Sequence, residues 1–88
     1  GWNKVNLKKK HHVFNGLSDL NNDGLYFYFV HSFFVVPKDK NIIIAESEHG
    51  IRFPSAIAKE NVIATQFHPE KSAHLGLRLL KNFVSWNP

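Results

Sequence analysis

The sequence predicts a mixed α/β chain in which an antiparallel-rich sheet is followed by a single C-terminal helix. Three observations predict this arrangement. Runs of β-branched and aromatic residues alternate with short polar turns up to residue 67. The turns between the later runs are only a few residues long, which favours antiparallel neighbours because a parallel crossover needs a dozen residues or more. Beyond residue 72 the apolar positions change to helical spacing.

The N-terminal half contains two predicted strands separated by a turn-rich stretch. Residues 3–10 begin as an extended segment, in which Val5 and Leu7 alternate with polar side chains. The stretch 18–24 contains Asn-Asn-Asp-Gly, and these residue types favour turns. Residues 25–36 form the strongest predicted strand, because β-forming residues dominate and both faces are apolar. We expect this strand to be central in the sheet and covered on both sides.

The C-terminal half carries three further predicted strands and the helix. The strands cover residues 42–47, 51–58 and 62–67, and each is bounded by polar or glycine-containing turns. Residues 73–86 place apolar side chains along one stripe, so this helix is amphipathic and should lie on the sheet. We expect the hydroxyl of Ser72 to cap its N-terminus.

The composition restricts the chemistry that this chain can perform. Its 88 residues, 43% of them hydrophobic, suffice for one small domain and exclude a disordered tail. The absence of cysteine excludes a disulfide framework, a thiolate metal site and a cysteine nucleophile within these residues. The lack of cysteine agrees with a reducing cytoplasm, where we expect the protein to act. No apolar run reaches membrane-spanning length. Methionine is also absent, so we expect Gly1 to be a processed or truncated start.

The formal net charge of +4 raises the question of nucleic-acid binding. Four of the basic residues, Lys4, Lys8, Lys9 and Lys10, lie within the first ten positions. A solvated strand end is the simpler interpretation, because the sequence contains no RNA-binding aromatic motif and no arginine-lined helix. A basic nucleic-acid binder is kept as a rival hypothesis, and salt-dependent binding to DNA would reveal it.

The most informative segment is Gln-Phe-His-Pro-Glu-Lys-Ser at 66–72, where a strand ends and the helix begins. His68 and Glu70 are two residues apart, so on an extended backbone their side chains share a face. Glu70 can then accept a proton-bearing ring nitrogen of His68, which fixes the tautomer of the imidazole. A base held by an orienting carboxylate is two-thirds of a nucleophilic triad. Taken alone, however, such a pair is more often a surface hydrogen bond.

The full string at 66–72 resembles the strand-end motif of class I glutamine amidotransferases, and within them the glutaminase subunits of imidazole glycerol phosphate synthase. The resemblance covers essentially the whole chain. Two departures are Phe33, which replaces the usual tyrosine and removes a hydroxyl, and His49, which stands where an aromatic residue commonly precedes Gly50. The other matching segments follow in the family's order: Gly-Trp-Asn at 1–3, Tyr-Phe-Val-His-Ser-Phe at 28–33, Phe-Pro-Ser-Ala at 53–56, and Gly-Leu, Leu-Leu and Asn-Phe within 76–83.

This resemblance implies a flavodoxin-like α/β parent fold, of which residues 1–88 form the C-terminal part. It implies hydrolysis of the glutamine side-chain amide, with His68 and Glu70 as catalytic members of a Cys-His-Glu triad whose cysteine lies upstream. It also implies a heterodimer with a cyclase subunit in histidine biosynthesis, with Trp2 and Lys71 at the interface. A core aromatic and a solvated charge are the alternative readings of these two residues. We expect no cofactor, no metal, no nucleic acid and no membrane.

The remaining histidines carry weaker signals. His31 lies in the most apolar strand and is better interpreted as a core histidine than as a site residue. His11, His12, His49 and His74 lack the convergent spacing that zinc ligands need, so they are predicted to be surface residues.

Two further rival functions follow from the same residues. One is a non-catalytic interaction module that retains the fold without the nucleophile. The other is a paralogous amidotransferase subunit that supplies ammonia for cell-surface sugar synthesis. Under all of these hypotheses the 88 residues alone are predicted to be inactive as a glutaminase, because they contain no thiolate.

Overall fold

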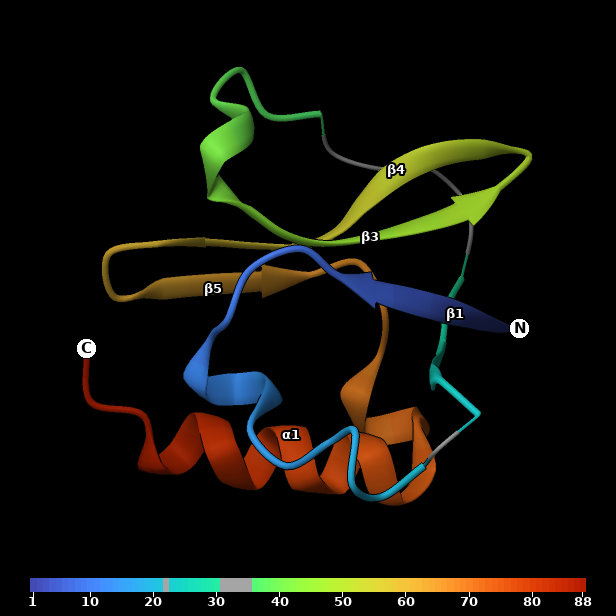
Figure 1. Cartoon of the computed structure of the whole chain (residues 1–88), viewed down its shortest axis with the longest axis vertical. Helices are drawn as coiled ribbons and strands as arrows, with labels where there is room; N and C mark the ends of the chain where they lie inside the picture. The colour runs from blue at the N-terminus through green and yellow to red at the C-terminus, as the bar shows by residue number, and fades with distance from the viewer. Residues whose placement is uncertain (22, 31–35) are drawn as a thin grey trace.

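The computed structural model of the chain describes residues 1–21, 23–30 and 36–88. These residues fold into a curled antiparallel sheet with one α-helix beneath it (Figure 1). All described strand pairs are antiparallel, which confirms the predicted antiparallel-rich sheet and C-terminal helix. The sheet order is β2-β1-β3-β4-β5. The strands are β1 (Trp2–Leu7), β2 (Leu25–Tyr28), β3 (Ile43–His49), β4 (Ile51–Lys59) and β5 (Val62–Thr65), with the short 3-10 helices η1 (His12–Phe14), η2 (Lys40–Ile42) and η3 (Pro69–Lys71) and the helix α1 (Ala73–Ser85).

Two tight hairpins explain the antiparallel order of the last three strands. The β3–β4 pairing runs up to His49 opposite Ile51, and the single residue between them, Gly50, has φ of +78°. Glycine suits this position because it adopts positive φ without a Cβ clash. The β4–β5 pairing begins with Lys59 opposite Val62, so only two residues connect these strands. These links leave no room for a parallel crossover.

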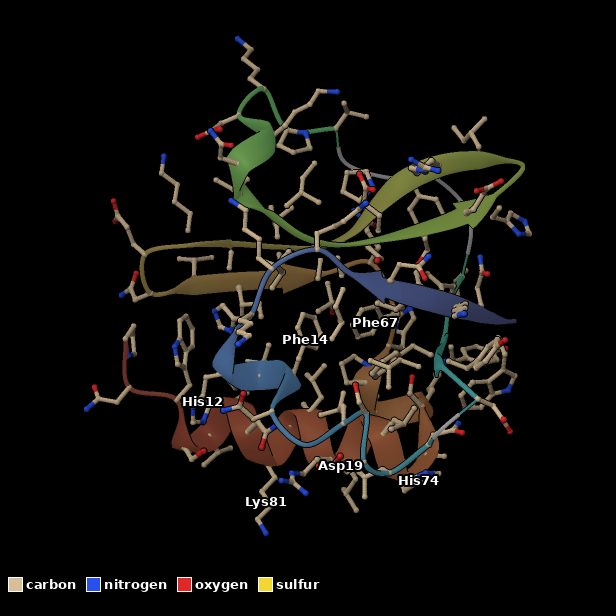
Figure 2. All side chains as sticks on the ribbon, in the orientation of Figure 1. His12, Phe14, Asp19, Phe67, His74 and Lys81 are labelled. Carbon is tan, nitrogen blue, oxygen red and sulfur yellow. The ribbon has the colours of Figure 1, made fainter. Side chains whose placement is uncertain are left out.

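The core lies between α1 and the concave side of the sheet. Phe14 and Phe67 point into this space, whereas Lys81 points away from it on the outer side of the helix (Figure 2). The apolar stripe of α1 explains the packing, because Leu75 and Leu79 are one helical turn apart and both are buried. The other large side chains of this core come from β1, from η1 and its flank, from β2 and the residue after it, and from β3 and β4: Val5, Val13, Leu17, Leu25, Phe27, Phe29, Ile44 and Phe53.

The expectation of a central strand at 25–36 with cover on both faces is wrong for the residues that the structure describes. β2 ends at Tyr28 and stands at one end of the sheet order. Phe27 and Phe29 are buried, whereas Tyr26 and Val30, which point to the opposite face, are exposed. The α-helix of the described residues covers only the inner face of the sheet, so Tyr26 and Val30 remain in contact with solvent. Residues 31–35, which include His31 and Phe33, lie outside the described residues.

Among the described elements, α1 carries the most exposed large apolar side chains, and they lie on its outer face. Leu77 and Val84 are 70% and 85% exposed, and Leu80 and Phe83 are also exposed. No helix among the described residues is long and apolar enough to cross a membrane.

Candidate functional site

The candidate site forms where the curled sheet closes on itself. Phe67, two residues after β5, makes an antiparallel bridge with Phe29, directly after β2. The next residue, His68, donates its backbone N–H to the carbonyl oxygen of Tyr28 at 2.8 Å. The chain then leaves the sheet through η3 and enters α1. His68 is therefore positioned by a contact between two strand ends that are far apart in the sequence.

The side chains of His68 and Glu70 meet, although Glu70 lies in the 3-10 helix η3 and not on the extended backbone that the sequence prediction assumed. Nδ1 of His68 lies 2.9 Å from Oε1 of Glu70. Because a carboxylate only accepts hydrogen bonds, Nδ1 carries the proton and Nε2 of the neutral ring keeps its lone pair. Pro69 between them occupies the first position of η3, where a missing N–H costs nothing. The arrangement leaves Nε2 able to take up or release a proton.

The exposure of this pair shows that its contribution to stability is small. The side chains of His68 and Glu70 are 42% and 57% exposed. Even with a protonated imidazole, an exposed ion pair contributes only about 0–1 kcal/mol to folding. The contact can nevertheless orient the imidazole, since it fixes which ring nitrogen bears the proton.

Ser72 does not cap α1 through its hydroxyl, which corrects the sequence prediction. Its Oγ instead accepts the backbone N–H of Tyr28 at 2.9 Å and donates to the carbonyl oxygen of His68 at 2.6 Å. The side chain is 1% exposed. Local spacing favoured the cap, whereas the observed partner on β2 is 44 residues away.

The two predicted interface residues converge on the ring of Tyr28. The Trp2 ring packs edge-on against Tyr28, with centroids 5.8 Å apart, and the Lys71 Nζ lies 5.9 Å from the same centroid. The second distance is within the range of a cation–π interaction. Trp2 is exposed rather than in the core. Sequence reasoning missed Tyr28 as the joining residue, because only the β1–β2 register sets it opposite Trp2.

The predicted surface histidines differ in their surroundings. His11 is half-buried and packs against Trp86 with ring centroids 4.8 Å apart. Its Nδ1 accepts the N–H of Val13, and burial, followed by the charge of His12, lowers its pKa. His12 lies beside the C-terminal end of α1, with Nε2 3.0 Å from Ser85 Oγ (Figure 2). Among the described residues, no group of three or more His, Cys, Asp and Glu side chains is arranged to hold a metal ion.

Comparison with known proteins adds an independent observation. The family model described as glutamine amidotransferase class-I matches residues 1–86. The protein from Aromatoleum aromaticum named imidazole glycerol phosphate synthase subunit HisH is 51% identical over 88 residues, which are 100% of this chain and 40% of that protein. Proteins of the same name from Dechloromonas aromatica and Hydrogenovibrio crunogenus are each 49% identical, over 100% and 99% of this chain and 39% of their own lengths. The chain thus spans about two-fifths of the curated relatives that it matches.

Proposed function

The chain belongs to the class I glutamine amidotransferase family, and on this basis we propose that it supplies the histidine and glutamate of a glutaminase site. In this proposal His68 is the general acid and base, and Glu70 orients it. The thiolate comes from polypeptide outside these residues, because they contain no cysteine. The observation that carries the proposal is the 2.9 Å contact between Nδ1 of His68 and Oε1 of Glu70.

The proposed reaction has two steps that share one imidazole. A cysteine thiolate attacks the side-chain carbonyl carbon of glutamine, the C–N bond breaks, and protonated His68 gives its Nε2 proton to the departing ammonia. Nε2 of His68 then takes a proton from water, which attacks the thioester carbon and breaks the C–S bond. Glutamate leaves and the thiolate is regenerated. Glu70 stabilises the imidazolium that carries the proton between the steps.

We further propose that the ammonia passes to a cyclase subunit, in a cytoplasmic heterodimer that acts in histidine biosynthesis. The names of the relatives support this proposal, since they describe subunits of imidazole glycerol phosphate synthase. The proposed docking surface includes Trp2 and Lys71, which share the Tyr28 ring. It adjoins His68, because the backbone of Tyr28 accepts the N–H of His68. A partner seated there would contact the site region directly.

Steady-state ammonia release from glutamine tests the proposal in a full-length subunit that carries these residues. His68→Ala is expected to lower kcat at least about 10³-fold, since it removes both proton transfers. Glu70→Gln is expected to lower kcat about 10²-fold, because it keeps the imidazole but changes its hydrogen-bond partner. His12→Gln is the matched control, because His12 lies at the opposite end of α1. Near-normal kcat in Glu70→Gln would refute the orienting role.

A second assay uses the 88 residues alone. No turnover above background is expected from them, because the acyl-enzyme route needs a thiolate that the sequence does not contain. Glutamine hydrolysis by this chain would refute the proposed division of the triad.

A further inference from the structure

One hydrogen bond between the strand ends at the site runs through a side chain. Two residues that face each other as a hydrogen-bonded antiparallel pair exchange two backbone bonds. His68 N–H donates directly to the Tyr28 carbonyl at 2.8 Å. In the opposite direction, Tyr28 N–H donates to Ser72 Oγ at 2.9 Å, and this hydroxyl donates to the His68 carbonyl at 2.6 Å. The Ser72 hydroxyl thus occupies the place of the return bond.

We propose that Ser72 is a positioning residue for His68. Its hydroxyl holds the His68 backbone at the closing point of the sheet and thereby sets the direction of the imidazole towards Glu70. The consequence for turnover rests on the proposed glutaminase function, whereas the positioning itself does not.

The burial of Ser72 means that water does not readily take over its role. The side chain is 1% exposed, and both of its bonds are to backbone groups. Removing the hydroxyl leaves the Tyr28 N–H, whose bond is part-buried, without its acceptor, and a backbone N–H that loses its partner is unfavourable. The backbones of Tyr28 and His68 are expected either to move apart or to shift until the Tyr28 N–H bonds directly to the His68 carbonyl. Either movement displaces the His68 carbonyl.

The backbone around Ser72 explains why such a displacement reaches the imidazole. The His68 carbonyl oxygen also accepts the N–H of Lys71 at 3.0 Å, and this hydrogen bond spans η3. A movement of the carbonyl therefore also moves η3. Ser72 is fixed on its other side, because its carbonyl accepts the N–H of Gly76 in α1 at 3.1 Å. The residue between Ser72 and the rest of the helix, Ala73, has φ of +53°, which L-residues rarely adopt. This junction is therefore set by its contacts rather than by local preference.

The test measures the tautomer of His68 by ¹⁵N NMR of the chain, at a pH well above the ordinary imidazole pKa of about 6.5. The unmodified chain is expected to hold mainly the Nδ1–H tautomer. In Ser72→Ala the ratio of Nδ1–H to Nε2–H is expected to fall about fivefold, the factor that loss of one ordinary hydrogen bond produces. Ser72→Thr keeps the hydroxyl and should restore the ratio. Ser85→Ala is the matched control, since its hydroxyl bonds at the far end of α1.

Several outcomes would overturn the proposal. An unchanged tautomer ratio in Ser72→Ala would do so, as would an equal change in Ser85→Ala. If Ser72→Ala does not fold, amide exchange in the unmodified chain decides. The Tyr28 N–H is expected to exchange at least about 100-fold more slowly than an unprotected amide, and rapid exchange would refute the relay.

Kinetics in the full-length subunit separate this proposal from the proposed function. Ser72→Ala is expected to lower kcat about tenfold with KM within about twofold of the parent, and Ser72→Thr should recover most of the loss. Absence of glutaminase activity in the unmodified subunit would refute the proposed function but leave the tautomer measurement valid. Normal kcat in a folded Ser72→Ala subunit would refute the positioning role alone.

Discussion

Replacement of Gly76 by alanine tests the close approach between α1 and η3. A Cβ built on Gly76 would lie 1.8 Å from the carbonyl oxygen of Pro69 and 2.8 Å from its carbonyl carbon. Real Cβ atoms essentially never approach other atoms closer than 3.0 Å, so the helix and the turn must separate by at least 3.0 − 1.8 = 1.2 Å. The obstacle is backbone, so no side-chain rotation relieves it. Because Pro69 follows His68, the separation also disturbs the candidate site.

The sign of the stability change decides between two physical effects. Alanine in a helix interior is favoured over glycine by about 1 kcal/mol, which alone would stabilise Gly76→Ala. Overpacking typically costs about 1–3 kcal/mol and sometimes more. A backbone clash of this depth belongs at the upper end, near 3 kcal/mol. The net expectation is a loss of about 2 kcal/mol in the free energy of unfolding.

Urea unfolding followed by tryptophan fluorescence measures this change. Gly76→Ala should lower the midpoint, and the His68 resonances should shift because Pro69 moves. Lys81→Ala is the control on the solvent side of the same helix and should change the free energy of unfolding by less than about 0.5 kcal/mol (Figure 2). A stabilisation of about 1 kcal/mol in Gly76→Ala would show that helix propensity dominates and that the close packing inferred here is wrong.

Three further predictions concern stability and association. Asn82 is buried and donates to two backbone carbonyls of the η1 region at 2.9 and 2.8 Å. Asn82→Ala should therefore lower the free energy of unfolding, measured in urea, by about 2–3 kcal/mol, and a loss below about 0.5 kcal/mol would contradict this. Burial and then a neighbouring histidine charge lower the pKa of His11 below its ordinary 6.5, so the unfolded chain binds more protons; stability should fall as the pH drops through 6.5 and level off below the folded pKa. His11→Asn should flatten that pH dependence, and an unchanged slope would argue against it. Leu77 and Val84 are 70% and 85% exposed, so the isolated chain should self-associate in analytical ultracentrifugation and the Leu77→Glu/Val84→Lys double variant much less so; identical sedimentation would exclude the helix face as the association site.

The sequence by itself determined the features that depend on neighbouring residues. The strand and helix segments were predicted to within a few residues for β3, β4, β5 and α1, because side-chain periodicity and turn residues act locally. The contact between His68 and Glu70 was also predicted, although the extended backbone on which that prediction rested ends at His68 and Glu70 lies in the 3-10 helix η3. The order of motifs along the chain identified the family, which the match over residues 1–86 confirms.

Only the tertiary structure decided which distant groups meet. The strand predicted as central is covered on one described face, because one helix cannot cover two sides of a sheet. The Ser72 hydroxyl had a local alternative as a helix cap, but closure of the sheet left the Tyr28 N–H, 44 residues away, in need of an acceptor. Trp2 and Lys71 likewise share the Tyr28 ring only because of the strand register and the position of η3. Local periodicity predicts elements, whereas the pairing of backbone groups across long separations depends on how the whole chain satisfies its buried hydrogen bonds.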